Sequence, residues 1–460
     1  MFATDDTIVA IATPPGPGGI GVVRVSGPLA TMIANSVLCR AAPLEPRRAT
    51  VTEVVGPWDS KAIDRVIATY FPRPGSYTGE DVVELSGHGN PVLLRQIVSA
   101  VIEAGARLAE PGEFTFRAYL NGRMDLVQAE AVADLADAVT PKQARAAFDQ
   151  LEGTMTSVVQ KIDQEVFDLI SLLEASLDFP EEGYHFVDEG SVASETTALA
   201  TRISQILADA DQGRLLREGC HVAIVGKPNV GKSTLFNALC GAPRAIVAET
   251  SGTTRDLLTE KIDLGGIPVT LVDTAGIHET QDPVEAEGID RAHRTVTVAD
   301  AVVVLLDGSC PLETKDRRIL EDTKNMRRLV IVSKRDLPSA WLVESESGIV
   351  SGSPVFEACL LLNNQTTLEG IRGRLMSVLE KNAGKETRDT PAVTNLRHIT
   401  LLRKAQTALV RAASSATACA AEELVITDLQ EARSALEEIS GKRTPDAVIE
   451  RIFERFCIGK

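Results

Sequence analysis

The segment GKPNVGKS, residues 226–233, has the residue types and spacing of a phosphate-binding loop. It fits the pattern G-x-x-x-x-G-K-[ST], follows the apolar run HVAIV and opens the helical stretch STLFNALC, which is the context this pattern requires. Glycines let successive backbone N–H groups turn toward phosphate oxygens at the start of a helix. Lys232 would then reach the β- and γ-phosphates, and the Ser233 hydroxyl would bind Mg²⁺. The context favours a nucleotide site over a glycine-rich turn without a ligand.

Two further polar segments follow the loop in the order typical of a GTPase. The segment DTAG, residues 273–276, ends the next apolar strand. There Asp273 can hold Mg²⁺ through water, and the Gly276 N–H can sense the γ-phosphate. The segment SGTTRD, residues 251–256, lies between the two motifs, and its Thr254 is the candidate for the mobile threonine that completes the Mg²⁺ shell.

A third segment, SKRD at residues 333–336, resembles the guanine-binding pattern N-K-x-D. Asp336 would accept hydrogen bonds from the ring N–H and the amino group of guanine, and the Lys334 stem would lie along the ring. Ser333 departs from the pattern, because serine is too short for everything that the asparagine does. The Ser-Ala-Lys of the last base-contacting loop appears only as EAC, residues 357–359. Together the motifs favour GTP over ATP.

The residue after DTAG is Ile277, where many GTPases carry a glutamine that orients the attacking water. An isoleucine cannot do this, so either hydrolysis is negligible or another group contacts the water. The following stretch offers the carboxylates Glu279, Asp282, Glu285 and Glu287. For each of them, a position on a solvated helix face is the commoner role.

Composition limits the setting in which these motifs can act. A chain of 460 residues is too long for one ordinary core and predicts two to four domains. Its net charge of -17 disfavours non-specific coating of nucleic acid, so DNA is not an expected partner and RNA would need a local basic patch. The seven scattered cysteines indicate reduced thiols. Without a long apolar run or a targeting segment, we expect a cytoplasmic protein that does not enter a membrane.

The texture of the sequence predicts four segments. Residues 1–118 mix β-branched runs with Gly/Pro turns, which is typical of an α+β domain. Residues 119–212 carry amphipathic helices, and helical texture returns over residues 390–460. Residues 217–380 alternate apolar strands with helices, which predicts a parallel sheet with crossover helices. The simplest organisation is one helical domain interrupted by an inserted α/β domain.

Several blocks of the sequence together resemble the MnmE (also called TrmE) family of tRNA-modification GTPases. They run in consistent order from residue 4 to residue 460: TIVAIATPPGPGGIGVVRVSG, YTGEDVVELSGHGNPV, PGEFTFRAYLNGRMDLVQAEAV, the P-loop, GTTRD, DTAGI and FCIGK. The resemblance implies a multidomain chain. It would have an α+β domain similar to tetrahydrofolate-binding domains through which two chains form a homodimer, a discontinuous all-α domain and an inserted Ras-like P-loop G domain.

The resemblance also implies an activity. Members hydrolyse GTP and work in a heterotetramer with the flavoprotein MnmG to place an aminomethyl or carboxymethylaminomethyl group on carbon 5 of the wobble uridine of certain tRNAs. The one-carbon unit comes from 5,10-methylene-tetrahydrofolate, of which 5-formyl-tetrahydrofolate is a binding analogue. The alternative is a regulatory switch, such as a ribosome-assembly GTPase, that performs no modification chemistry. A folate enzyme of the aminomethyl-transfer type is a weaker alternative, because it would not need a P-loop.

For hydrolysis, the resemblance assigns a potassium ion that stands where other GTPases use an arginine finger. It would bind when a second G domain orders the loop around Thr253. Glu285 becomes the catalytic carboxylate that orients water, and no role is carried over to His278. The implied K⁺ ligands are Asn229, Ala248, Thr250 and Thr253, and the implied Mg²⁺ ligands are Ser233 and Thr254. The implied GTP contacts are Asn229, Val230, Gly231, Lys232, Ser233, Thr234, Ala248, Glu249, Thr250, Ser251, Gly252, Thr253, Thr254, Asp273, Thr274, Ala275, Gly276, Ser333, Lys334 and Asp336.

For modification, the resemblance assigns a folate site to Arg24, Glu84 and Arg123. A pteridine ring offers donors to a carboxylate, and the glutamate tail of a folate needs cations. The C-terminal FCIGK would lie against the N-terminal domain and add the cation of Lys460. Cys457 is then a candidate nucleophile toward carbon 6 of uridine, or a redox-sensitive residue. By itself, the tail would be interpreted as a frayed end with a buried or idle thiol.

Overall fold

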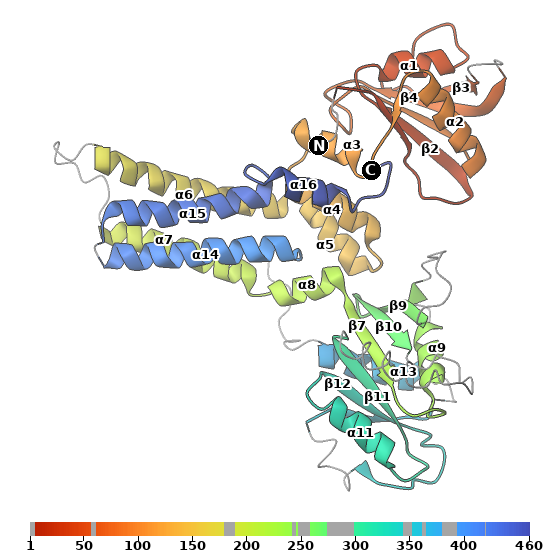
Figure 1. Cartoon of the computed structure of the whole chain (residues 1–460), viewed down its shortest axis with the longest axis vertical. Coiled ribbons are helices and arrows are strands. Elements are labelled where there is room, and N and C mark those ends of the chain that lie inside the picture. Colours follow the sequence, from red (N-terminus) through yellow and green to blue (C-terminus); the bar gives the residue numbers. More distant parts are fainter. Residues whose placement is uncertain are drawn as a thin grey trace. The chain divides into compact units, whose positions relative to one another are not determined.

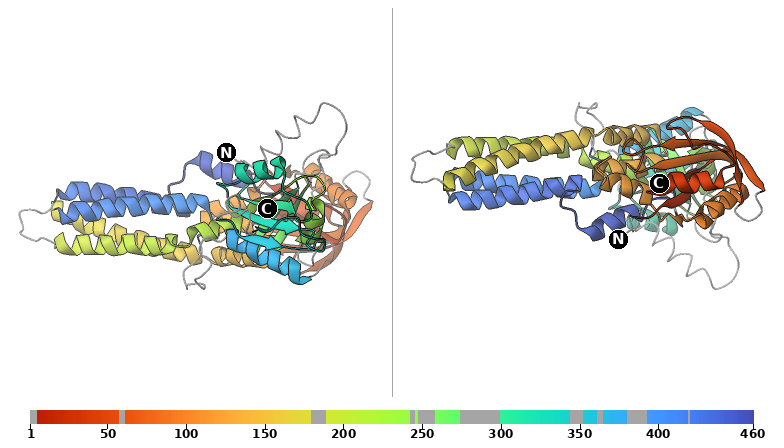
Figure 2. Two further views of the ribbon diagram at one scale, coloured as in Figure 1. Left: turned by 90° about the horizontal axis from the view of Figure 1, so that it is seen from below. Right: turned by 90° about the horizontal axis from the view of Figure 1, so that it is seen from above.

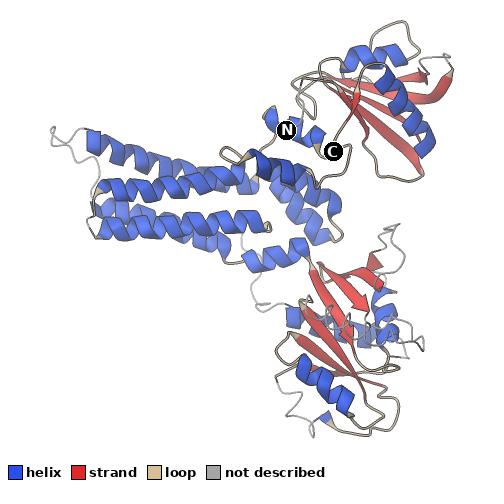
Figure 3. Cartoon of the chain, viewed as in Figure 1, coloured by secondary structure: helices blue, strands red, loops and turns tan. Residues whose placement is uncertain are grey.

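The structure, a computed structural model, describes residues 5–56, 61–178, 189–241, 245–246, 258–273, 299–343, 352–360, 365–379, 393–418 and 420–460 (Figures 1 and 3). The chain forms two compact units. The first consists of Met1–Ala136, Ala147–Ser204 and Thr400–Lys460, and the second of Asp137–Ala146 and Gln205–Ile399.

The N-terminal part of the first unit is built on a six-stranded sheet of order β3-β4-β5-β2-β1-β6. Its strands are β1 (Ile8–Ile11), β2 (Gly18–Ser26), β3 (Thr50–Val55), β4 (Ala62–Phe71), β5 (Val82–Gly89) and β6 (Arg107–Leu108). Helices α1 (Ala30–Val37) and α2 (Pro91–Glu103) bury their apolar residues against the alternate, inward-facing positions of β2, β4 and β5. Neither α1 nor α2 covers the other face of these strands. This agrees with the α+β texture of the sequence.

A partly buried ion cluster joins this sheet to α3 (Glu113–Leu120). The guanidinium of Arg117, 1% exposed, donates to Asp6 Oδ1 at 2.6 Å and to Glu113 Oε1 at 2.9 Å. Arg107 donates to the same two carboxylates, at 2.7 Å in each case. Bonds from Arg107, followed by those from Arg117, outweigh desolvation and lower the pKa of Asp6. Buried charges persist only when they are paired in this way.

Helices from both ends of the chain pack together in the first unit. Four long helices, α6, α7, α14 and α15, lie side by side in Figures 1 and 2. Arg433 of α15 lies 4.4 Å from the ring centroid of Phe167 in α6, and 3.4 Å from the Asp163 carboxylate. The predicted pairing of two helical halves is therefore confirmed. The bounds are α4 (Leu126–Asp137), α6 (Thr154–Asp178), α7 (Glu189–Leu207), α14 (Leu396–Thr417), α15 (Glu422–Ser440) and α16 (Asp446–Phe453).

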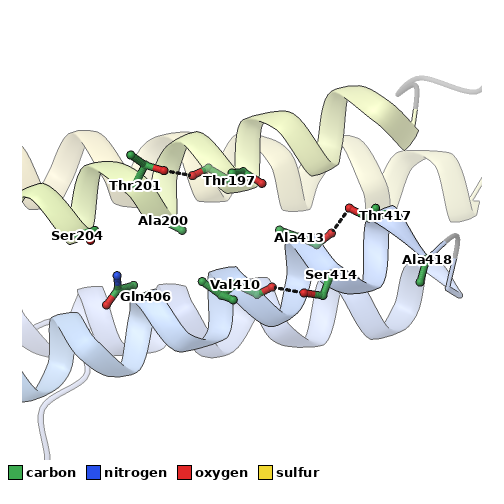
Figure 4. A pocket seen from close by; sticks show the side chains of 10 residues that line it. All are labelled: Thr197, Ala200, Thr201, Ser204, Gln406, Val410, Ala413, Ser414, Thr417 and Ala418. Carbon is green, nitrogen blue, oxygen red and sulfur yellow. Dashed lines mark hydrogen bonds between the residues drawn. The ribbon is translucent and has the colours of Figure 1, made fainter.

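A shallow groove of about 630 Å³ lies between α7 and α14 (Figure 4). Its walls are mostly small alanine, serine and threonine side chains, together with Gln406 and Val410 of α14. The hydroxyls of Thr201, Ser414 and Thr417 donate to the carbonyl oxygens four residues earlier in their own helices. These three hydroxyls are therefore already bonded within their own helices. Among the described helices, none is long and apolar enough to cross a membrane.

The second unit is built on a seven-stranded sheet of order β13-β12-β11-β7-β10-β9-β8. The strands from β13 to β10 are parallel, β9 is antiparallel to β10, and β8 is antiparallel to β9. Helices α9 and α13 pack on one face and α11 on the other, so β11 and β12 are buried almost throughout. The bounds are α8 (Ala210–Glu218), β7 (Cys220–Val225), α9 (Lys232–Cys240), β8 (Ala245–Ile246), β9 (Leu258–Leu264), β10 (Ile267–Asp273), β11 (Ala301–Asp307), α11 (Thr314–Asp322), β12 (Arg328–Ser333), β13 (Val355–Glu357) and α13 (Gln365–Leu379).

The second unit also includes the beginning of α5 (Pro141–Leu151), which lies far from the P-loop in the sequence. Thr140 Oγ1 donates to the carbonyl oxygen of Gly266, in the β9–β10 turn, at 2.8 Å. The Lys142 stem fills the space in which a Cβ on Gly266 would lie. Gln143 Nε2 donates to the Arg217 carbonyl oxygen at 2.9 Å. These contacts hold the beginning of α5 within the second unit.

Candidate functional site

The P-loop connects β7 to α9 through residues whose backbone conformation favours glycine. Gly226 has φ 157°, Asn229 has φ 62° and Gly231 has φ 104°. A Cβ on Gly226 would lie 2.5 Å from the Leu305 carbonyl oxygen, so the loop can pass this close to β11 only with glycine at that position. The predicted strand–loop–helix arrangement of the phosphate motif is thus present.

Lys232, at the start of α9, closes the loop from inside. Its Nζ donates to the carbonyl oxygens of Gly226 at 2.8 Å and Lys227 at 2.7 Å, and the residue is largely buried. These bonds fix the ammonium group where the loop curves. A phosphate oxygen is the natural further acceptor for a cation held in this way.

A second lysine, Lys227, ties the loop to the first turn of α11. Its Nζ lies 2.7 Å from Asp316 Oδ2 and 3.2 Å from Glu313 Oε2. Asp316 is 2% exposed and also accepts from the Glu313 N–H at 2.9 Å, as part of a capping box. The bond from Asp316 raises the pKa of Lys227. Sequence reasoning missed this contact, because nothing in the P-loop pattern indicates a partner in α11.

The SKRD segment lies where β12 ends, next to the end of β11. Lys334 has φ 58° and donates to Asp307 Oδ2 at 2.6 Å. Burial favours a higher pKa for Asp307, but bonds from Lys334 and Ser309 outweigh it and lower the pKa. Ser333 is buried and Asp336 is exposed. Glu357, the first residue of EAC, ends β13 and pairs with Arg335 at 2.8 Å.

The remaining predicted nucleotide contacts cannot all be placed. The Asp273 backbone ends β10, opposite Ile224 of β7. The residues outside the described parts of the chain are Ala248, Glu249, Thr250, Ser251, Gly252, Thr253, Thr254, Thr274, Ala275, Gly276, Ile277, His278 and Glu285.

The metal ligands predicted on the P-loop have suitable chemistry. Asn229 offers an amide oxygen, and Ser233, an exposed residue in the first turn of α9, offers a hydroxyl oxygen. Hard oxygen donors of this kind suit Mg²⁺ and K⁺. Within the described part of the chain, no three side chains of the His, Cys, Asp and Glu types form a cluster for a metal.

The N-terminal domain holds a second cluster, around Arg24. Arg24 on β2 and Glu84 on β5 stand opposite each other in antiparallel register, with Nη2 2.9 Å from Oε1. The guanidinium carbon lies 5.0 Å from the ring centroid of Tyr77 and 5.7 Å from that of Phe114. Burial raises the pKa of Tyr77, whose hydroxyl is 2.9 Å from Thr115 Oγ1. The structure thus brings together two of the predicted folate residues.

Sequence reasoning missed Tyr77 and Phe114. Both belong to the blocks that carry the family resemblance, and aromatic residues make up only 4% of the chain. Because aromatic residues are this scarce, their presence in these blocks was the signal that could have pointed to the site. Arg123, a third predicted folate residue, is exposed, and its stem lies beside Gly79, two positions after Tyr77.

The C-terminal tail lies against the N-terminal domain, as predicted. Ile458 forms an antiparallel bridge with Pro111, and Gly459 contacts the Ile11 backbone closely, in a conformation with φ 99°. Ile11 pairs with Val23, the neighbour of Arg24. Cys457 is exposed and Lys460 is half-buried. Burial, by contrast, raises the pKa of the Cys220 thiol to about 12, so that thiol is inert.

The sheet order, the glycine-dependent loop and the buried Lys232 define a P-loop nucleotide-binding domain of the GTPase class. Comparison with known proteins gives the family. The model of the MnmE helical domain matches residues 126–457, and the model of the GTP-binding protein TrmE N-terminus matches residues 7–123. The chain therefore belongs to the MnmE family of tRNA modification GTPases, and it is a GTP hydrolase.

Curated relatives match over nearly their whole length. A tRNA modification GTPase MnmE from Alkaliphilus oremlandii is 38% identical, over 99% of each chain. One from Syntrophotalea carbinolica is 41% identical, again over 99% of each chain. A crystal structure of Era from Aquifex aeolicus is 23% identical, covering 41% of this chain and 66% of that one, with a TM-score of 0.29.

The Lys227–Asp316 contact leads to a stability prediction. Lys227→Met would leave the buried Asp316 carboxylate without its cation, so we expect the second unit to lose about 2 kcal/mol of local stability. Hydrogen exchange of the α11 amides in the full chain measures this loss. Adding Asp316→Asn should recover part of it, and Lys324→Met, which removes an exposed pair with Glu321, is the control. Equal exchange in the Lys227→Met and Lys324→Met variants would contradict the prediction.

Proposed function

We propose that the chain uses GTP hydrolysis to drive modification of carbon 5 of the wobble uridine in certain tRNAs, together with the flavoprotein MnmG. The one-carbon unit would come from 5,10-methylene-tetrahydrofolate bound in the N-terminal domain, and the protein would act as a cytoplasmic homodimer. The Arg24–Glu84 pair is the observation that carries this proposal. A regulatory switch that performs no chemistry would not need such a site.

The cluster around Arg24 has the chemistry to hold a folate. The Glu84 carboxylate can accept hydrogen bonds from the amino and ring N–H groups of a pteridine. Its ion pair with Arg24 holds it in place, and the rings of Tyr77 and Phe114 fix the guanidinium from other directions. Arg123 and Lys460 are the proposed cations for the glutamate tail of the folate.

The proposed hydrolysis converts GTP and water into GDP and phosphate at the P-loop. The backbone N–H groups of residues 229–234 and the Lys232 ammonium bind the phosphates and stabilise the charge that develops on them. Glu285 orients the attacking water. Ser233 and Thr254 would hold Mg²⁺, with Asp273 reaching it through water, and Asn229, Ala248, Thr250 and Thr253 would hold K⁺ when two G domains pair. These cations would neutralise negative charge on the transferred phosphoryl group.

The face of the N-terminal sheet opposite α1 and α2 supports the proposed homodimer. Val51 on β3 and Ile67 on β4 are directly paired, and they are 69% and 45% exposed. Ile67 pairs in turn with Ser86 of β5, which pairs with Val22 of β2. Three of these four positions, on β2, β3 and β4, are apolar, and such a row is a suitable surface for a second copy of the chain.

The assignment of phosphate binding and hydrolysis to different residues can be tested. Lys232→Ala should abolish GTP binding, because it removes the cation of the P-loop. Glu285→Ala should leave binding unchanged and remove hydrolysis, because only the water contact is lost. Nucleotide titration and phosphate release in the presence of K⁺ measure the two steps. Hydrolysis by the Glu285→Ala variant at the normal rate would show that this carboxylate is not the one that orients water.

Mass spectrometry of tRNA nucleosides tests the modification itself. In a strain that lacks this protein, the modified wobble uridine should disappear and return when the wild-type gene is restored. We propose that the exposed Cys457 acts in modification, so Cys457→Ser should spare GTP hydrolysis and lower the yield of modified uridine. Unchanged wobble uridines in the deletion strain would exclude the proposed function. A normal yield with Cys457→Ser would exclude only the role of the thiol.

Folate binding separates the proposal from the alternative of a regulatory switch. Calorimetry with 5-formyl-tetrahydrofolate should give a saturable binding heat with the wild-type chain and a much weaker one with Arg24→Ala. Arg95→Ala, in the exposed part of α2, is the matched control and should bind normally. The absence of binding heat with the wild-type chain would favour the switch.

A further inference from the structure

We propose that Ser333 ties the P-loop to the sheet and does not contact the nucleotide base. This chain would then recognise guanine through Asp336 while residue 333 leaves the N7 atom of the base without a donor. The inference rests on GTP binding at the P-loop and concerns how the base of that GTP is read.

The position of the Ser333 hydroxyl carries the inference. Its Oγ lies 2.7 Å from the carbonyl oxygen of Val230 in the P-loop and 3.0 Å from the carbonyl oxygen of Leu306 in β11. Ser333 itself is 1% exposed. The side chain therefore sits between the end of β12 and the inner side of the loop, away from the surface.

The number of protons on the side chain decides what else it can do. A hydroxyl donates one hydrogen bond, and both neighbouring oxygens are acceptors. The single Ser333 proton is thus committed to a backbone carbonyl, and none remains for a nucleotide. An asparagine amide carries two N–H donors, so it could bond a carbonyl with one and offer the other to a ligand.

The other members of SKRD remain suited to a base. The Nζ of Lys334 is held by Asp307, which orients the stem of the side chain. Asp336 is exposed, so its carboxylate can accept from the N1–H and the 2-amino group of guanine. Those two donors distinguish guanine from adenine. N7 is an acceptor on a different edge of the guanine base.

A nucleotide altered at one atom tests the inference. In 7-deaza-GTP a carbon replaces N7, while the groups facing Asp336 are unchanged. We expect the wild-type chain to bind GTP and 7-deaza-GTP with Kd values within about twofold of each other. The Ser333→Asn variant should bind GTP about three- to tenfold more tightly than the wild-type chain does, which is the value of one added hydrogen bond. Its affinity for 7-deaza-GTP should not increase. If the wild-type chain binds 7-deaza-GTP at least fivefold more weakly than GTP, the inference is overturned.

Two further variants separate the tie from recognition of the base. Ser333→Ala should weaken the binding of GTP and of 7-deaza-GTP by the same factor, because it leaves the Val230 carbonyl without its donor. A loss of affinity for GTP alone would overturn the inference. Asp336→Asn should shift preference from GTP to XTP, and retention of the GTP preference would also overturn it. If the wild-type chain binds neither GTP nor 7-deaza-GTP, the nucleotide site itself falls, an outcome distinct from failure of the N7 test.

Discussion

A P-loop can bind phosphate only if its backbone carbonyls find donors elsewhere. Each N–H turned toward an anion leaves a carbonyl that points back into the protein, where an unbonded polar group is costly. Here Lys232 bonds the carbonyls of Gly226 and Lys227, and Ser333 bonds that of Val230. The second of these donors exists only because β11 places the end of β12 beside the loop. The sheet order and the nucleotide site are therefore aspects of a single constraint.

Much of this could be predicted from the sequence, because strand–loop–helix motifs carry their own geometry. The strand HVAIV, the phosphate-binding loop that follows it and the pairing of helical halves follow from local pattern. Only the family resemblance predicted that Arg24 and Glu84 belong to one site. The Lys227–Asp316 contact and the ring of Phe114 under Arg24 could not be predicted, since each depends on how distant elements pack. Glu285 and the residues near it lie outside the described parts of the chain and stay predictions.

The N-terminal domain combines two kinds of charge placement. Arg107 and Arg117 neutralise Asp6 and Glu113, and these pairs, of which Arg117 and Glu113 are fully buried, hold α3 and the sheet together. The Arg24–Glu84 pair is partly exposed and lies on aromatic rings. The first arrangement leaves little room for a ligand, while the second leaves carboxylate lone pairs accessible. Gly459 of the C-terminal tail contacts Ile11 of β1, in the strand pair that presents Arg24, so one small region joins both ends of the sequence.

The bonds of Thr140 and Gln143 to the β9–β10 turn and to α8 have a consequence for modularity. A GTPase domain inserted into a host protein is often pictured as a cassette attached only at its two ends. In this chain, the first part of the host helix α5 belongs to the same unit as the inserted domain, and the Lys142 stem occupies the space that a Cβ on Gly266 would need. The two can no longer diverge independently, because a substitution in the α5 segment changes the surroundings of a strand turn in the GTPase domain. A transplant of this domain to another protein would have to carry that helix with it.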